Sequence, residues 1–76
     1  MENVESLPPT LAERVRGAMA ERRITGAELA RRLEVTQPYM SRRLTGEVEF
    51  RYSDLERIAE ALDVPLSRLL PAEVTA

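Results

Sequence analysis

Residues 25–46, TGAELARRLEVTQPYMSRRLTG, form the stretch that decides the fold. Two short amphipathic segments lie in it, and each is preceded by a threonine, Thr25 or Thr36, whose hydroxyl can cap a helix. Pro38 falls in the first turn of the second segment, where its missing N–H costs nothing. Gly46 is well placed to end that segment in the left-handed conformation that glycine tolerates. The stretch therefore predicts two short helices in succession.

These two predicted helices are joined only through residues 33–36, which leaves room for nothing but a tight turn. Two short helices joined in this way are the sequence form of a helix-turn-helix unit. In that geometry the first helix braces against the DNA backbone, and the second lies in the major groove with its N-terminal residues facing the base edges. The central stretch therefore points to double-stranded DNA as the partner.

Helical spacing continues on both sides of the central stretch. Capping boxes start helices at residues 10–13 and 53–56, as they do at 25–28, and one more short helical turn lies between Pro65 and Pro71. The residues that we expect to face the core are Leu11, Val15, Ala18, Met19, Leu29, Ala30, Leu33, Met40, Leu55, Ile58, Ala59 and Leu62. No segment alternates with a period of two for long enough to argue a strand. We therefore predict an all-α, compact five-helix domain.

The length of 76 residues allows one small domain, for which we predict residues 10–71, preceded by a flexible leader, residues 1–9, and followed by a tail, residues 72–76. Cysteine and histidine are both absent, so the chain lacks the usual general base and the commonest metal ligands. We therefore expect no enzyme activity, no cofactor and no metal. No apolar run approaches the roughly 20 residues of a membrane span, and the N-terminus does not resemble a signal peptide, so we expect a cytoplasmic protein.

The charge is distributed unevenly along the chain. All eleven basic residues are arginine, and the formal net charge is −2. Residues 14–51 contain nine arginines against five glutamates, a net charge of +4, whereas the rest of the chain carries −6. A local basic segment matters more to a polyanion than the sum over the whole chain, so this balance permits DNA binding.

The chain resembles the Cro/C1-type (Xre-like) family of helix-turn-helix regulators. The resemblance covers about residues 10–71 and is carried by TGAELARRL at 25–33, VTQPYMSR at 35–42 and the apolar stripe that follows Gly46. QPYMSRRLTG at 37–46 looks like the recognition helix of actinobacterial and actinophage immunity repressors. The resemblance implies a lambda-repressor-like fold and a sequence-specific regulator of transcription, either a phage or prophage repressor or a Cro-like protein. Such a regulator binds an imperfect palindrome as a homodimer, in the bacterial or host-cell cytoplasm.

By position, the resemblance implies which side chains of the third helix read bases: Gln37, Pro38, Tyr39, Ser41 and Arg42. Their chemistry agrees, because glutamine pairs with adenine, arginine pairs with guanine, and proline or tyrosine contacts a thymine methyl group. Tyr39 is equally suited to packing on the preceding helix. Contacts with DNA phosphates are expected at Thr25, Gly26, Arg31, Arg32, Thr36 and Arg43. For these arginines a solvated helix face is the alternative.

Four residues depart from the pattern of the family. Gly26 occupies the place where many members carry a polar side chain that contacts a phosphate, and Arg43 replaces a commonly apolar residue. Glu34 stands at the turn position that often holds glycine, and a left-handed conformation there costs a non-glycine residue free energy. Leu44 stands where an acidic residue is frequent, and we expect it to pack against its neighbours.

The last apolar residues, Leu66, Leu69 and Leu70, are expected either to close the core or to form a dimer seam. A second class of function also stays open, a helical protein-interaction module such as an antitoxin, whose main partner is a protein. Steep salt dependence of DNA binding favours the regulator. Weak, sequence-blind DNA binding together with a tight protein complex favours the interaction module.

Overall fold

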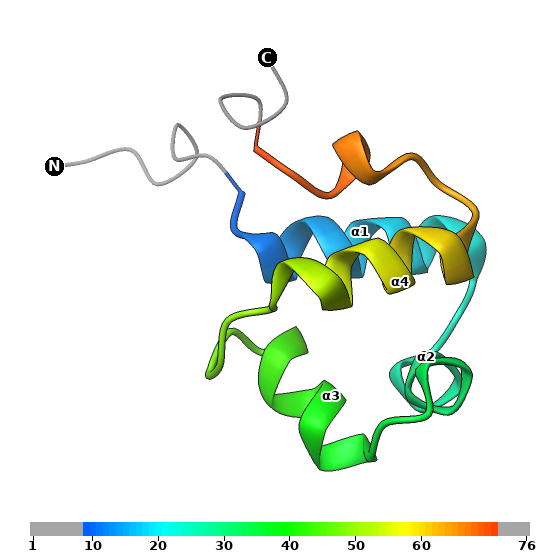
Figure 1. Ribbon diagram of the computed structural model, residues 1–76, viewed down its shortest axis with the longest axis vertical. Coiled ribbons are helices and arrows are strands. Elements are labelled where there is room, and N and C mark those ends of the chain that lie inside the picture. Colours follow the sequence, from blue (N-terminus) through cyan, green and yellow to red (C-terminus); the bar gives the residue numbers. More distant parts are fainter. Residues whose placement is uncertain (1–8, 72–76) are drawn as a thin grey trace, which may run out of the picture.

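The structure, a computed structural model, describes residues 9–71 and contains four helices in this range. They are α1 (Leu11–Arg22), α2 (Gly26–Leu33), α3 (Gln37–Leu44) and α4 (Tyr52–Leu62), followed by a 3-10 turn, η2 (Leu66–Arg68). In Figure 1, α1 and α4 run alongside each other, and α2 and α3 lie on one side of this pair. The all-α prediction is confirmed. Apart from Pro9, the predicted leader and tail lie outside the described residues.

The predicted count of five helices is wrong, because the last apolar segment forms only a 3-10 turn. The N–H groups of Arg68 and Leu69 donate to carbonyls three residues earlier, each over 2.9 Å. Bonds of this spacing make the tighter 3-10 geometry. Pro71 disfavours the helical conformation at Leu70 before it and has no N–H of its own, so the segment does not lengthen into an α-helix.

Threonine caps start the first three helices, as the sequence predicts. At α1 the capping box is complete, since Thr10 Oγ1 accepts from the Glu13 N–H over 3.1 Å and the Glu13 carboxylate accepts from the Thr10 N–H over 2.7 Å. Thr25 and Thr36 accept from N–H groups three residues later, over 3.1 and 3.2 Å. The box at 25–28 is therefore formed on one side only, because the Glu28 carboxylate binds Arg31 and Arg32 instead.

Helix α4 begins earlier than the predicted capping box at residues 53–56. Its N-cap is Arg51, and its first residue is Tyr52. The Arg51 N–H donates to the carboxylate of Asp54 over 3.1 Å. Because Asp54 supplies this cap from the third position of the helix, the first turn forms before Ser53 is reached.

Three of the helices end at a non-glycine residue in the left-handed conformation. Arg23, Glu34 and Asp63 have φ angles of 56°, 59° and 57°. The expectation for Glu34 is thus confirmed. Gly46, which follows α3, has φ 89°, in the region that its sequence position predicts. These reversals allow four short helices to fold back on one another within 63 residues.

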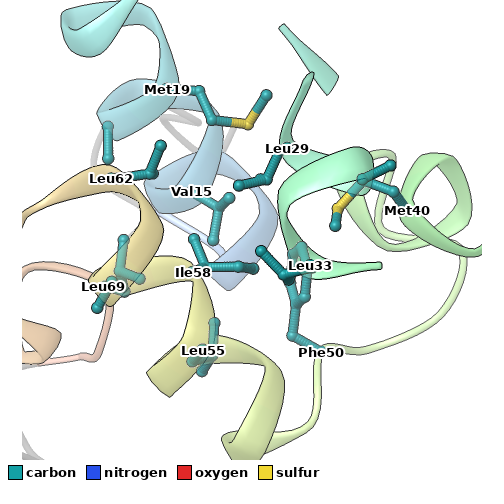
Figure 2. Close-up of a cluster of buried hydrophobic side chains, with 13 residues drawn as sticks. Val15, Met19, Leu29, Leu33, Met40, Phe50, Leu55, Ile58, Leu62 and Leu69 are labelled. Carbon is teal, nitrogen blue, oxygen red and sulfur yellow. The ribbon is translucent and has the colours of Figure 1, made fainter. Parts of the chain in front are cut away.

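The core lies between α1, α4 and the helix pair α2–α3, and Figure 2 shows side chains from all four helices converging there. Of the predicted core residues, all but Leu11 are buried, and Leu11 is partly buried against the cluster. Phe50 closes the core from the connector between α3 and α4. Leu69 is fully buried and therefore belongs to the core, whereas Leu66 and Leu70 are only partly buried. The prediction that Leu69 forms part of a dimer seam is therefore wrong.

Arginine side chains tie the helices together at their C-terminal ends. Arg22 donates to the Asp63 carbonyl over 2.8 Å, and Arg32 donates to the Ala61 carbonyl over 3.0 Å. Two further arginines do the same across the molecule, Arg16 to the carbonyl of Leu44 and Arg57 to the carbonyl of Leu33. The last carbonyls of a helix have no partner within it, so an arginine from another helix supplies the missing donor. We call these four contacts the arginine ties.

Candidate nucleic-acid interface

Helix α3 presents one continuous exposed face. The exposed residues recur at helical spacing, and they are Gln37, Pro38, Ser41, Arg42 and, at the C-cap, Thr45. Met40 points inward and is 2% exposed, as predicted. Four of the five side chains expected to read bases therefore lie together on the outer surface. Tyr39 is the exception, because it is only partly exposed.

The N-terminus of α3 differs from those of the other three helices in its charge. The first turns of α1, α2 and α4 each contain an acidic residue, whereas the first turn of α3 contains none. Aligned peptide dipoles leave about half a positive charge at a helix N-terminus, and an acidic side chain there offsets it. The positive end of α3 is thus left for an anionic partner, at the point where Gln37 and Pro38 begin the exposed face.

A buried polar cluster fixes α3 to the start of α4. The Tyr39 hydroxyl lies 3.0 Å from both carboxylate oxygens of Asp54, to which it donates. The guanidinium of Arg43 stacks on the Tyr39 ring at 3.5 Å from the ring centre, and its Nη1 donates to the Tyr39 carbonyl over 3.1 Å. Arg43 Nε lies 3.7 Å from the Asp54 carboxylate. We call Tyr39, Arg43 and Asp54 the buried cluster.

This cluster changes the roles expected for two residues. Arg43 is 9% exposed, so its charge faces Asp54 and the Tyr39 ring rather than the surface expected for a phosphate contact. The Tyr39 hydroxyl is held by Asp54 at the start of α4, a contact that neither the base-reading role nor packing on the preceding helix predicted. Asp54 was missed by the sequence reasoning. A signal was present, because Asp54 lies four residues before Ile58 and so shares the inward face of α4.

The arginines of α2 share one acidic partner. Glu28 binds Arg31, whose side chain is 72% exposed, and accepts from Arg32 Nε over 2.8 Å. The hydrogen bond from Arg32, with the charge of Arg31 beside it, lowers the pKa of Glu28. Arg32 also donates a hydrogen bond to the Ala61 carbonyl, which holds its guanidinium against α4. Of the two, Arg31 is therefore the side chain left to reach a phosphate.

The start of α2 packs closely against the end of α3. A Cβ atom added at Gly26 would lie 3.2 Å from Leu44 Cδ1, which is tighter than an ordinary contact. Leu44 is partly buried there, in agreement with the packing role expected for it. Beside this contact lies a hollow of about 180 Å³, with Gly26 and Ala27 on one side and Met40, Leu44 and the exposed side chains Gln37 and Ser41 on the other. We call it the α2–α3 hollow.

Comparison with known proteins agrees with this geometry. A family model described as a helix-turn-helix domain matches residues 10–71. The chain belongs to the helix-turn-helix domain family. No curated protein and no solved structure gives a significant match.

In this helix-turn-helix domain, α2 and α3 are the two helices of the motif, and the turn between them contains the left-handed Glu34. Helix-turn-helix domains bind DNA with the second helix of the motif, which here is α3. Its exposed face and its uncompensated N-terminus are the features that such binding uses. No helix in the described part of the domain has the length and apolar character to cross a membrane.

Proposed function

We propose that this helix-turn-helix domain is a sequence-specific regulator of transcription of the Cro/C1 type that inserts α3 into the major groove of double-stranded DNA. The observation that carries the proposal is the exposed face of α3, where four predicted base-reading side chains follow a helix N-terminus that lacks an acidic residue. Protein side chains of these types distinguish base pairs through the donors, acceptors and methyl groups of the major groove.

The proposed contacts divide along α3. Gln37, in the first turn, pairs with adenine through N6 and N7, and Pro38 beside it contacts a methyl group or the edge of a neighbouring base. Arg42, five residues further on, lies about 7.5 Å along the helix axis and pairs with guanine through O6 and N7. Ser41 lies between them on the same exposed face. Thr25, Gly26, Arg31 and Thr36 contact the phosphates on either side, as a frame that fixes the position of α3.

The regulator acts as a homodimer in this proposal. Two copies of α3 enter successive major grooves about 34 Å apart, so the operator is an imperfect palindrome. Occupancy of the operator blocks RNA polymerase, so the protein acts as a repressor. From the resemblance, it is a phage or prophage repressor or a Cro-like protein of the cytoplasm. We propose a binding role rather than an enzymatic one, since the sequence offers neither histidine nor cysteine.

Selection of bound duplexes from a random DNA library, at roughly physiological salt, tests the proposal. We expect enrichment of two inverted half-sites. A single asymmetric site contradicts the homodimer but keeps sequence-specific DNA binding. No enriched sequence contradicts the regulator altogether and favours a protein partner, which affinity measurements against candidate proteins would then have to identify.

A further inference from the structure

The α2–α3 hollow borders the exposed face of α3, yet no proposed contact fills it. Gln37 and Ser41, two of the side chains proposed to read bases, stand at its edge. Met40, which is 2% exposed, and the partly buried Leu44 supply apolar surface inside it. The hollow is therefore continuous with the surface that meets the bases, and its interior has a different chemistry from that surface.

The side chains that line the hollow select for an uncharged, apolar group. None of its seven lining residues, all of which lie in the described part of the chain, is charged. The exposed arginines of α2, Arg31 and Arg32, are not among the lining residues. A phosphate inside the hollow would meet no cationic side chain in exchange for the water it loses, which is costly for a charged group. The partial positive charges at the starts of α2 and α3 lie at the edge of the hollow, where a phosphate can stay hydrated. An apolar group would gain contact with Met40 and Leu44 at no such cost.

In the major groove the apolar group that a base pair presents is the C5-methyl group of thymine. We propose that the α2–α3 hollow is a specificity site that receives the methyl group of a thymine next to the base pair read by Gln37. The inference rests on the proposed function and names one feature of its operator. Gly26 maintains the site, because a side chain at that position would press on Leu44 and narrow the hollow.

Replacement of thymine by deoxyuridine in the selected operator tests this site, because the change removes the methyl group and leaves the hydrogen-bonding edge intact. Each thymine is replaced singly, and the dissociation constant is measured by fluorescence anisotropy. We expect one position in each half-site to lose about four-fold in affinity, which corresponds to about 0.8 kcal/mol for one buried methyl-sized group.

A variant that fills the hollow identifies the protein side of the contact. Ala27 is exposed at the edge of the hollow, so Ala27→Leu occupies the space with little change to the core. We expect Ala27→Leu to bind the thymine and deoxyuridine operators equally at the sensitive position. Ala20→Leu, a change at an exposed alanine of α1, serves as the matched control and should keep the four-fold difference. Gly26→Ala narrows the same hollow by a different route and replaces Ala27→Leu if that variant fails to fold.

The outcomes separate this inference from the proposed function. A selected operator that binds equally well with deoxyuridine at every thymine overturns the inference and leaves the regulator in place. A sensitive thymine that remains sensitive in both Ala27→Leu and Gly26→Ala also overturns it, because the methyl group then contacts another surface. Absence of any selected operator overturns the proposed function and the inference together.

Discussion

At the scale of single residues, Asp54 is the side chain that joins α3 to the start of α4. It accepts hydrogen bonds from the Tyr39 hydroxyl and from the Arg51 N–H, and it is the acidic group nearest to the buried Arg43 guanidinium. A buried charge that loses its partner is destabilising by several kcal/mol. The recognition helix therefore depends on a carboxylate that belongs to α4.

Asp54→Ala is expected to lower the free energy of unfolding by about 3 kcal/mol, because it leaves Arg43 and Tyr39 without their shared partner. Urea denaturation followed by circular dichroism measures the change. Glu56→Ala, on the exposed side of the same helix, is the control and should change stability by less than about 0.5 kcal/mol. A loss below about 1 kcal/mol for Asp54→Ala would show that the buried cluster contributes little.

Arg42 and Arg31 are both exposed arginines, but we expect different effects from their removal. Arg42→Ala should cost about 1–3 kcal/mol in affinity for the operator and relax the preference at one base pair in each half-site. Arg31→Ala should weaken binding to all duplexes alike and reduce the slope of log affinity against log salt by about 0.9 for each copy. Competition binding over a range of salt concentrations separates the two. Equal loss of base preference in both variants would refute the assignment of the reading face.

At the scale of helices, local chemistry predicts most of what the structure contains. The threonine caps at residues 10, 25 and 36 depend only on neighbours in the chain, and all three form. The start of α4 and the burial of Arg43 were mispredicted. Both involve Asp54. Its cap on the Arg51 N–H is local and could have been found from the sequence, whereas its contacts with Tyr39 and Arg43 join two helices and leave no mark in local spacing. Side chains on the outer face of α3 were predictable because exposure there follows from the helical period.

The three left-handed helix ends carry a conformational cost that glycine would avoid. Glu34→Gly is expected to raise the free energy of unfolding by roughly 0.5–1 kcal/mol, the relief of the left-handed strain less the entropy lost by glycine. Thermal unfolding measures the gain. Glu56→Gly, in the interior of α4, should instead lower the stability by about 1 kcal/mol. A loss of stability in Glu34→Gly would mean that the glutamate side chain makes a contact that outweighs the strain.

At the scale of the whole molecule, ion pairs and caps make stability depend on pH only in acid. The hydrogen bond from Arg68 lowers the pKa of Glu21, that from the Thr10 backbone N–H lowers the pKa of Glu13, and that from Arg32 lowers the pKa of Glu28. Lowered pKa values in the folded state mean that the stabilisation is complete above the ordinary value of 4.5 and is lost as the pH falls through the folded-state pKa.

We therefore expect the free energy of unfolding to decline below about pH 4.5. Between about pH 8 and pH 5 it should stay level, because the sequence contains no histidine to titrate in that range. Urea denaturation at a series of pH values measures this profile. Glu21→Gln should reduce the acid-dependent part of the decline. A transition centred near pH 6.5 would contradict this prediction.

The arginine ties bear on whether the DNA-reading unit can be transplanted. The donor to the last carbonyl of α2 is Arg57, 24 residues away from Leu33, and the donor to the last carbonyl of α3 is Arg16, 28 residues away from Leu44. A peptide of residues 25–46 includes neither donor. A graft of this helix pair onto a foreign scaffold must therefore bring the two arginines with it, or both helices lose the donors at their C-terminal ends. The motif is compact in sequence, but its support is distributed over the whole domain.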